Sequence, residues 1–445
     1  MLTDTIVAMS TPSGRGGIGI VRLSGPRATQ IVDEVISREL PKPRVATYTE
    51  FFDLQNNKID AGLLIIFKAP ASYTGENVCE LHVHGNPIIL SEIVRVCCEV
   101  GARLARPGEF TERSYRAGKK DLLQAEAVAD LISAQSIKAV RSAQKTLEGE
   151  FGHSVDALIS QAQEIRYQLE AAIDFSEDVM DSVFTSRMMG EHKNLLVNLN
   201  RLLMSAVQGV KLNEGFRLVI VGSPNAGKSM LLNRLVMSER AIVSEEAGTT
   251  RDTIHVESRL RDFPVQIVDT AGLRKNVQND VEKEGIKRTY AAIRDADLVI
   301  YLMDITTVAG QADNRSLDLP IDANILVVYN KVDKVSDTEA SQYESGICIS
   351  ALSGTGLDKL EDAIIRSFSA LDNENVEFVA RERHVIALKA AMTFIKKTTP
   401  DSFEATPELV AEDYRNATKA LEEIGGEYST EDLLGDIFSK FCVGK

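Results

Sequence analysis

The sequence predicts an α/β plus α protein in which a second α/β domain interrupts a helical domain. Residues 1–118 alternate short apolar strands, near 5–9, 19–23, 61–67 and 78–83, with turns. Apolar residues then recur every three or four positions, as in Ala162, Ile165 and Leu169, which is the period of an amphipathic helix. Helical patterns return near 379–397, 407–424 and 430–441, after a further strand-rich stretch. We therefore predict an α/β domain (1–118), helices (119–212), an inserted α/β domain (213–372) and returning helices (373–445).

The inserted domain opens with a phosphate-binding loop at 222–229. Its sequence, Gly-Ser-Pro-Asn-Ala-Gly-Lys-Ser, follows an apolar strand (216–221) and precedes a helix that we expect from Met230. Gly222 and Gly227 let the backbone close around phosphate oxygens, Lys228 can reach the outer phosphates, and the Ser229 hydroxyl can bind magnesium. We expect Asn225, Ala226 and Met230 to line the same nucleotide site.

Four further motifs follow in the order typical of a Ras-like GTPase domain. In Gly248-Thr249-Thr250 we choose Thr250 as the second magnesium ligand, and Asp269-Thr270-Ala271-Gly272 ends the apolar strand 265–268 beside the metal and the third phosphate. In Asn330-Lys331-Val332-Asp333, the last carboxylate can accept two hydrogen bonds from guanine, whereas adenine offers no such pair of donors. Ser350-Ala351-Leu352 suits the final guanine loop, although leucine replaces the more usual lysine. The motifs together predict GTP and Mg²⁺ as ligands.

One departure from the Ras pattern bears on hydrolysis. Leu273 follows Gly272, where Ras-like proteins carry the glutamine that orients the attacking water. Asn225 and the stretch Ser244-Glu245-Glu246, with Ala247 after it, offer oxygen ligands for a second, monovalent cation. Alternatively, Asn225 only stabilises the phosphate loop, and Glu245 and Glu246 belong to a solvated face. Glu282 can orient water or be an ordinary surface residue of a helix.

Composition limits the class of protein. The 445 residues exceed one domain of about 150 residues, and five cysteines without Cys-x-x-Cys spacing indicate neither a zinc site nor a disulfide framework. The absence of a long apolar run or a signal peptide predicts a cytoplasmic protein with no membrane association. Net charge is −15, yet residues 1–120 hold 15 Lys and Arg against 13 Asp and Glu. A local basic surface or a solvated charged face fits the cluster Arg103, Arg106, Arg113, Arg116, Lys119 and Lys120.

The chain resembles the bacterial tRNA-modification GTPases of the MnmE (TrmE) family from end to end. The resemblance is carried by residues 4–8, 14–17, 105–110 and 125–132, by the GTPase motifs, and by the terminal Cys-Val-Gly-Lys. It implies an N-terminal domain that binds tetrahydrofolate and forms a homodimer. It also implies a heterotetramer with the FAD-containing MnmG (GidA), which modifies carbon 5 of the wobble uridine of certain tRNAs. The added group is carboxymethylaminomethyl or aminomethyl, with 5,10-methylene- or 5-formyl-tetrahydrofolate as the one-carbon donor.

The resemblance also implies site residues. Folate contacts fall on Arg22, Glu80 and Lys119, with Lys445 nearby. The family's K⁺ ligands fall on Asn225, Ser244, Glu246 and Thr249, and its Mg²⁺ ligands on Ser229 and Thr250. The expected catalytic residues are Glu282, which matches the family's water-orienting glutamate, the phosphate-loop lysine Lys228, and Cys442, which matches the family's cysteine. Potassium would then bring two GTPase domains together and supply the positive charge that an activating protein supplies elsewhere.

Two other functions stay open. One is a regulatory GTP switch in ribosome or RNA assembly, without carbon transfer; folate binding by residues 1–120 would count against it. The other is a folate-dependent transferase of small metabolites in which GTP only regulates. Failure to associate with tRNA or an FAD-containing partner would favour that second function.

Overall fold

The structure is a computed structural model that forms two compact units. It describes residues 4–134, 136–174, 182–237, 255–261, 263–269, 290–308, 324–343, 346–371, 378–426 and 431–444. The first unit comprises residues 1–129, 146–175 and 406–445, and the second comprises residues 130–145 and 176–405. Across the described ranges, no helix combines the length and the apolarity needed to cross a bilayer.

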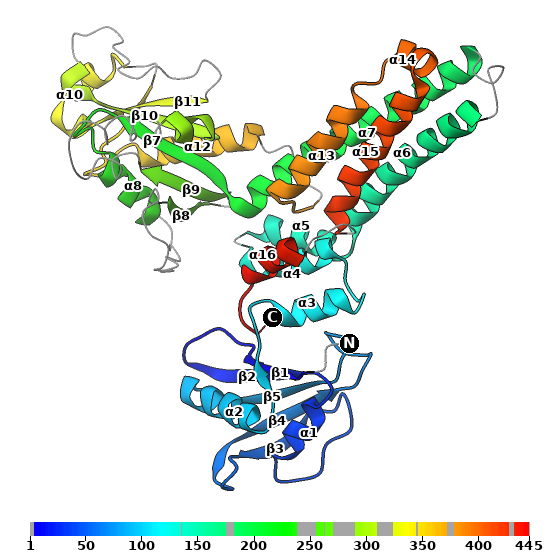
Figure 1. The fold of residues 1–445 in the computed structure, drawn as a ribbon. Coiled ribbons are helices and arrows are strands. Elements are labelled where there is room, and N and C mark those ends of the chain that lie inside the picture. The colour runs from blue at the N-terminus through cyan, green and yellow to red at the C-terminus, as the bar shows by residue number, and fades with distance from the viewer. Residues whose placement is uncertain are drawn as a thin grey trace, which may run out of the picture. The chain divides into compact units, whose positions relative to one another are not determined.

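A six-stranded sheet in the order β3-β4-β5-β2-β1-β6 forms the N-terminal domain (Figure 1). Only the outer pair, β1 and β6, is parallel. Helices α1 and α2 bury their apolar residues against one face, with Val21, Leu64 and Leu81 of the strands. Successive strand residues point to opposite faces, so the other face carries the polar side chains of β2 and β5. The elements are β1 (Ile6–Met9), β2 (Gly16–Ser24), α1 (Ala28–Asp33), β3 (Thr47–Phe52), β4 (Lys58–Phe67), β5 (Val78–Gly85), α2 (Pro87–Glu99), β6 (Arg103–Leu104) and α3 (Glu109–Arg116).

Helices from both ends of the chain complete the first unit. They are α4 (Leu122–Ser133), whose last residues belong to the second unit, α6 (Glu150–Asp174), α15 (Pro407–Gly425) and α16 (Glu431–Ser439). α6 and α15 pack along each other, and Leu158, Ile165 and Leu169 of α6 are buried at the expected helical period. α16 packs on α3 and α4 through Leu122, Phe438 and Phe441 (Figure 1).

The second unit contains helices outside the inserted domain, of which α7 leads into that domain and α13 follows it. They are α5 (Ile137–Leu147), whose last two residues belong to the first unit, α7 (Ser182–Glu214), α13 (Glu382–Ile395) and α14 (Pro400–Ala405). α7 enters the domain and packs on α13, which leaves it. The exit segment lies so close to α7 that a Cβ on Gly209 would come within 2.5 Å of the Phe378 carbonyl oxygen. Arg381 donates to Asp130 Oδ1 at 2.8 Å and Asn213 donates to the same oxygen at 3.2 Å, which ties entry and exit together.

The inserted domain has a six-stranded sheet in the order β12-β11-β10-β7-β9-β8. All neighbouring strands are parallel except β8 and β9. Its elements are β7 (Phe216–Gly222), α8 (Lys228–Met237), β8 (His255–Leu260), β9 (Phe263–Asp269), β10 (Leu298–Asp304), α10 (Ile305–Val308), β11 (Ile325–Asn330), the 3₁₀ turn η2 (Val332–Lys334), α11 (Asp337–Ala340), β12 (Ile347–Cys348) and α12 (Leu357–Leu371). The predicted fold class is confirmed: a Ras-like P-loop domain lies within a helical domain that follows an α/β domain.

In the arginine cluster of residues 103–116, Arg103, Arg106 and Arg116 are exposed, as a solvated charged face predicts, whereas Arg113 is buried. Arg113 has only 1% of its side chain exposed and bonds Asp4, Glu76 and Glu109. Arg103 also bonds Asp4 and Glu109. In the same way, Arg106 pairs with Glu112, and Arg116 with Glu112 and Glu431. Helical spacing accounts for the pairs of Arg113 with Glu109 and of Arg116 with Glu112, whereas the partners Asp4, Glu76 and Glu431 are distant in sequence and are not revealed by periodicity.

Candidate functional site

The phosphate-binding loop connects the carboxyl end of β7 to the start of α8. Gly222, the last residue of β7, has φ +153°, and a Cβ there would lie 2.1 Å from the carbonyl oxygen of Leu302 in β10. Only glycine fits this close approach of two backbones. The helix begins at Lys228, two residues before the predicted Met230, so its N-terminal N–H groups face the loop. This geometry suits an anion such as a nucleotide phosphate.

Two side chains of the loop have defined positions. Asn225 adopts a left-handed backbone conformation, φ +64°, and its side chain is exposed. Asparagine tolerates this conformation better than most residues, so the structure gives it a backbone role whether or not it also binds a cation. Lys228 donates from Nζ to the carbonyls of Gly222 at 2.9 Å and Ser223 at 2.8 Å. Its ammonium therefore lies over the loop, where phosphates would bind.

Asn330 joins the phosphate end of the site to the base end. Its Nδ2 donates to the carbonyl of Ala226 at 2.7 Å, and its Oδ1 accepts from the backbone N–H of Ala351 at 2.9 Å. The side chain is buried, and a Cβ on Gly227 would approach Asn330 Nδ2 to 2.3 Å. Loops more than 100 residues apart in sequence thus share one amide side chain.

The predicted guanine residues converge in the same way. Asp333 is exposed, and its Oδ1 accepts a hydrogen bond from Ser350 Oγ. Lys331, at φ +71°, reaches back to Asp304 Oδ2 at 2.5 Å. Although burial disfavours the charged form of Asp304, its bonds to Lys331 and Thr306 hold its pKa below the usual range. The Asp333 carboxylate, which Ser350 orients just after β11, can accept hydrogen bonds from a purine edge.

Several predicted residues lie outside the described residues. They are Ser244, Glu245, Glu246, Ala247, Gly248, Thr249, Thr250, Thr270, Ala271, Gly272, Glu282 and Lys445. Asp269 ends β9, next to β7 in the sheet, as predicted. Ser229 and Met230 lie in the first turn of α8, where Met230 is 46% exposed.

A second polar cluster lies on the face of the N-terminal sheet opposite α1 and α2. Arg22 of β2 and Glu80 of β5 pair across the strands, with Arg22 Nε donating to Glu80 Oε1 at 2.9 Å. Glu80 also contacts His82 Nε2 at 3.3 Å, and the Arg22 guanidinium lies 5.7 Å from the ring centre of Tyr73 and from that of Phe110. Burial raises the pKa of Tyr73. This set of carboxylate, cations and aromatic rings fits a flat ligand with N–H donors and an anionic tail.

Lys119 and Lys120 reach the same region by different routes. Lys119 Nζ donates to the carbonyls of Pro70 and Ser72, each at 2.7 Å. Lys120 Nζ lies 5.8 Å from the centre of the Tyr73 ring, the ring that Arg22 also contacts. The predicted Lys119 therefore holds the loop that presents Tyr73, while its neighbour lies over that ring.

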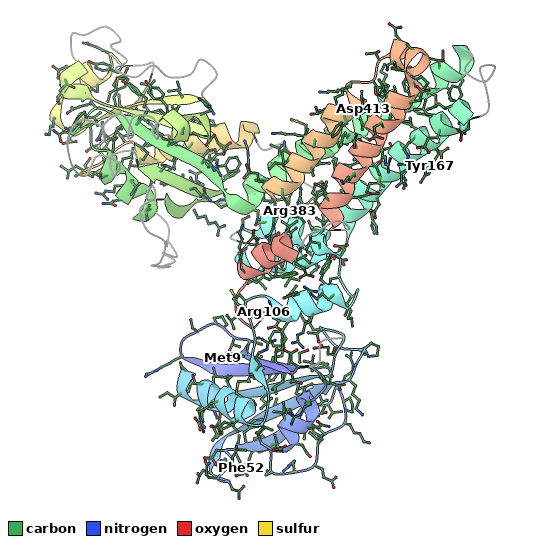
Figure 2. The ribbon with its side chains drawn as sticks, viewed as in Figure 1. Met9, Phe52, Arg106, Tyr167, Arg383 and Asp413 are labelled. Carbon is green, nitrogen blue, oxygen red and sulfur yellow. The ribbon has the colours of Figure 1, made fainter. Side chains whose placement is uncertain are left out.

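The end of the chain docks on the N-terminal domain. Val443 forms an isolated β-bridge with Pro107, and Ser10 Oγ donates to the Gly444 carbonyl at 3.0 Å. Gly444 has φ +96°, and a Cβ there would lie 2.0 Å from the Met9 carbonyl oxygen. Met9 and Arg106 mark this region in Figure 2. Met9 follows Ala8 in β1, and Ala8 pairs with Arg22 of β2 in the sheet, so the tail docks one residue away from the Arg22 cluster. The predicted Cys442 of this tail is exposed.

Sequence reasoning missed residues that hold predicted ones in place. Asp304 anchors Lys331, Arg234 of α8 contacts the final guanine loop, and Tyr73 and His82 surround the Arg22 pair. The position of Asp304 at the end of an apolar strand beside the nucleotide site was a usable signal. Tyr73 and His82 had no signal, because the pairing of β2 with β5 places His82 and the loop between β4 and β5 places Tyr73.

Comparison with known proteins gives the family. The MnmE helical domain description matches residues 122–442, and the description of the GTP-binding protein TrmE N-terminus matches residues 5–119. A tRNA modification GTPase MnmE of Hydrogenovibrio crunogenus is 42% identical over 99% of both chains, and one of Aeromonas hydrophila is 43% identical over 100% of both. One of Legionella pneumophila is 42% identical, again over the full length of both chains. The chain belongs to the MnmE family of tRNA modification GTPases.

Proposed function

We propose that this GTPase is activated by potassium and works with an FAD-containing partner, MnmG, in the cytoplasm to modify the wobble uridine of certain tRNAs. In this proposal a tetrahydrofolate derivative supplies the carbon for a carboxymethylaminomethyl or aminomethyl group at carbon 5. The working assembly is a heterotetramer of two copies of each protein. The observation that supports the nucleotide part most directly is the bridge from Ala226 through Asn330 to Ala351. It unites a phosphate loop with a base-binding loop, as a guanine-nucleotide site requires.

Guanine selection is assigned to Asp333, because its exposed carboxylate is oriented by Ser350. Guanine donates from N1 and from its 2-amino group, whereas xanthine carries a carbonyl in place of that amino group. We expect Asp333→Asn to lose GTP binding and to gain binding of xanthosine triphosphate. Unchanged GTP affinity, measured by calorimetry at saturating Mg²⁺, would remove Asp333 from this role.

The potassium proposal depends on Asn225 together with Ser244, Glu246 and Thr249. The exposed amide of Asn225 lies on the phosphate loop and offers an oxygen ligand. When bound, a monovalent cation would supply positive charge to the phosphates in place of an arginine finger. Glu282 is proposed to orient the attacking water, since Leu273 cannot.

Turnover of GTP in K⁺ and in Na⁺ at equal ionic strength tests this proposal. The left-handed conformation of Asn225 calls for two variants, because alanine changes both the backbone preference and the ligand. Asn225→Gly keeps that conformation accessible and removes only the amide oxygen. Loss of potassium stimulation in both variants supports a cation ligand. Stimulation that survives in Asn225→Gly but not in Asn225→Ala would mean that Asn225 only shapes the loop.

Folate binding is assigned to the cluster around Arg22 and Glu80. Glu80 has 16% of its side chain exposed and can accept from ring N–H groups, and the cations around Tyr73 suit a glutamate tail. We expect Glu80→Gln to weaken binding of 5-formyl-tetrahydrofolate and to abolish tRNA modification while leaving GTP turnover intact. A wild-type chain that hydrolyses GTP but binds no folate would favour a regulatory switch instead.

A further inference from the structure

An arginine of the phosphate-side helix reaches the base-side loop. Arg234 lies in α8, less than two turns after Lys228, and its side chain is exposed. Its Nε donates to the carbonyl of Ala351 at 3.1 Å, and its Nη2 donates to the carbonyl of Leu352 at 2.6 Å. Two donors of one planar guanidinium therefore bind two successive carbonyls.

The loop that Arg234 holds also orients the guanine-binding carboxylate. Ser350 Oγ donates to Asp333, and the N–H of Ser353 donates to Ser350 Oγ at 3.1 Å. Leu352 of this loop is 62% exposed, and residues 350–356 include no lysine or arginine. The loop therefore has no cationic side chain of its own, and the guanidinium of Arg234 from α8 lies against it.

We propose that Arg234 is a positioning residue for guanine recognition. It fixes residues 351 and 352, and through Ser350 it fixes the orientation of Asp333. Asn330 makes the second connection between the phosphate and base loops, so the two loops are tied twice. A loop ordered before binding loses less conformational entropy when the nucleotide arrives, and this raises affinity. The inference rests on the guanine-nucleotide site proposed above.

The test compares full-length wild-type protein with Arg234→Met and Arg234→Lys. Methionine keeps an unbranched apolar stem without donors, and lysine keeps a charge without the fork. Arg261→Met is the matched control, because Arg261 is an exposed arginine of the same domain that bonds Asp362 of α12 instead. Affinities for GTP and for inosine triphosphate, and dissociation rates of fluorescent GDP, are measured. Inosine lacks the 2-amino group from which Asp333 would accept a hydrogen bond.

We expect Arg234→Met to bind GTP about tenfold more weakly, a change of about 1.4 kcal/mol, mainly through faster dissociation. The preference for GTP over inosine triphosphate should fall several-fold, with Arg234→Lys between wild type and Arg234→Met. The control Arg261→Met should have the nucleotide affinities and the GDP dissociation rate of wild type. GTP affinity equal to wild type overturns the inference, as does an equal loss for both nucleotides with a lowered melting temperature, since that pattern indicates general destabilisation. Wild-type protein that fails to prefer GTP would instead overturn the guanine site itself.

Discussion

Glu109 provides a quantitative test of the buried ion-pair network in the N-terminal domain. Its side chain is 1% exposed, and it bonds Arg103, Arg113 and the backbone N–H of Arg106. Burial alone would raise its pKa, yet these bonds lower it from 4.5 to about 2. A shift of about 2.5 pKa units corresponds to about 3 kcal/mol of stability at neutral pH. Glu109→Gln, which keeps the shape and removes the charge, should therefore lower the unfolding free energy of this domain by about 3 kcal/mol at pH 7.

The pH dependence has a definite direction. A carboxyl whose pKa is lower in the folded state stabilises fully above its unfolded value of 4.5, and this contribution is lost as pH falls towards 2. The difference between wild type and Glu109→Gln should thus be constant from pH 7 to 5.5 and fall to about half at pH 3. Urea unfolding at each pH, together with hydrogen exchange of peptides from residues 103–116, measures this difference in unfolding free energy.

A control within the same domain keeps this test specific. Glu92 forms an exposed pair with Arg95, so Glu92→Gln should change stability by less than about 0.5 kcal/mol. Equal effects of the two substitutions, or a Glu109→Gln effect that does not vary with pH, would refute the reasoning.

Three further substitutions follow from single contacts. Asp130→Asn weakens the pair with Arg381 and should cost about 2 kcal/mol, seen as faster hydrogen exchange at residues 209–213 and 378–382; unchanged exchange at both segments would contradict this. Gly190→Ala, at an exposed site of α7 with no atom within 4 Å of the new Cβ, should stabilise by up to about 1 kcal/mol and raise the melting temperature; a lower one would show that α7 is strained there. Gly444→Ala places its Cβ 2.0 Å from the Met9 carbonyl, so the tail should release and carboxypeptidase should remove it faster; cleavage at the wild-type rate would show that the tail does not need this close approach.

The described part of the nucleotide site, the phosphate loop and the two guanine loops, could be predicted because its residues lie in short contiguous motifs. The phosphate loop needs glycine where backbones nearly touch, as at Gly222 and Gly227, and those requirements leave a fixed spacing in the sequence. Asn330 and Asp333 were predicted for the same reason. Arg234 was not, because a lone arginine in a helix has the same pattern as any solvated residue.

The N-terminal cluster shows the opposite case. The resemblance implied Arg22 and Glu80, but only the antiparallel pairing of β2 with β5 places them opposite each other, next to His82. Arg113 was predicted as part of a charged surface, but folding buries it against Glu76, from the loop before β5, and against Glu109 of its own helix.

The sequence by itself determined the order of domains, the phosphate and guanine motifs and the alternation of strands and helices. These are local properties, set by backbone requirements and by the period of apolar residues. Only the tertiary structure decided which charges are buried, which loops share a side chain and where the end of the chain docks. The physical reason is that the free energy of a charge or a carbonyl depends on the partner that folding brings to it, and partners such as Arg113 and Glu76, or Ser10 and Gly444, are distant in sequence.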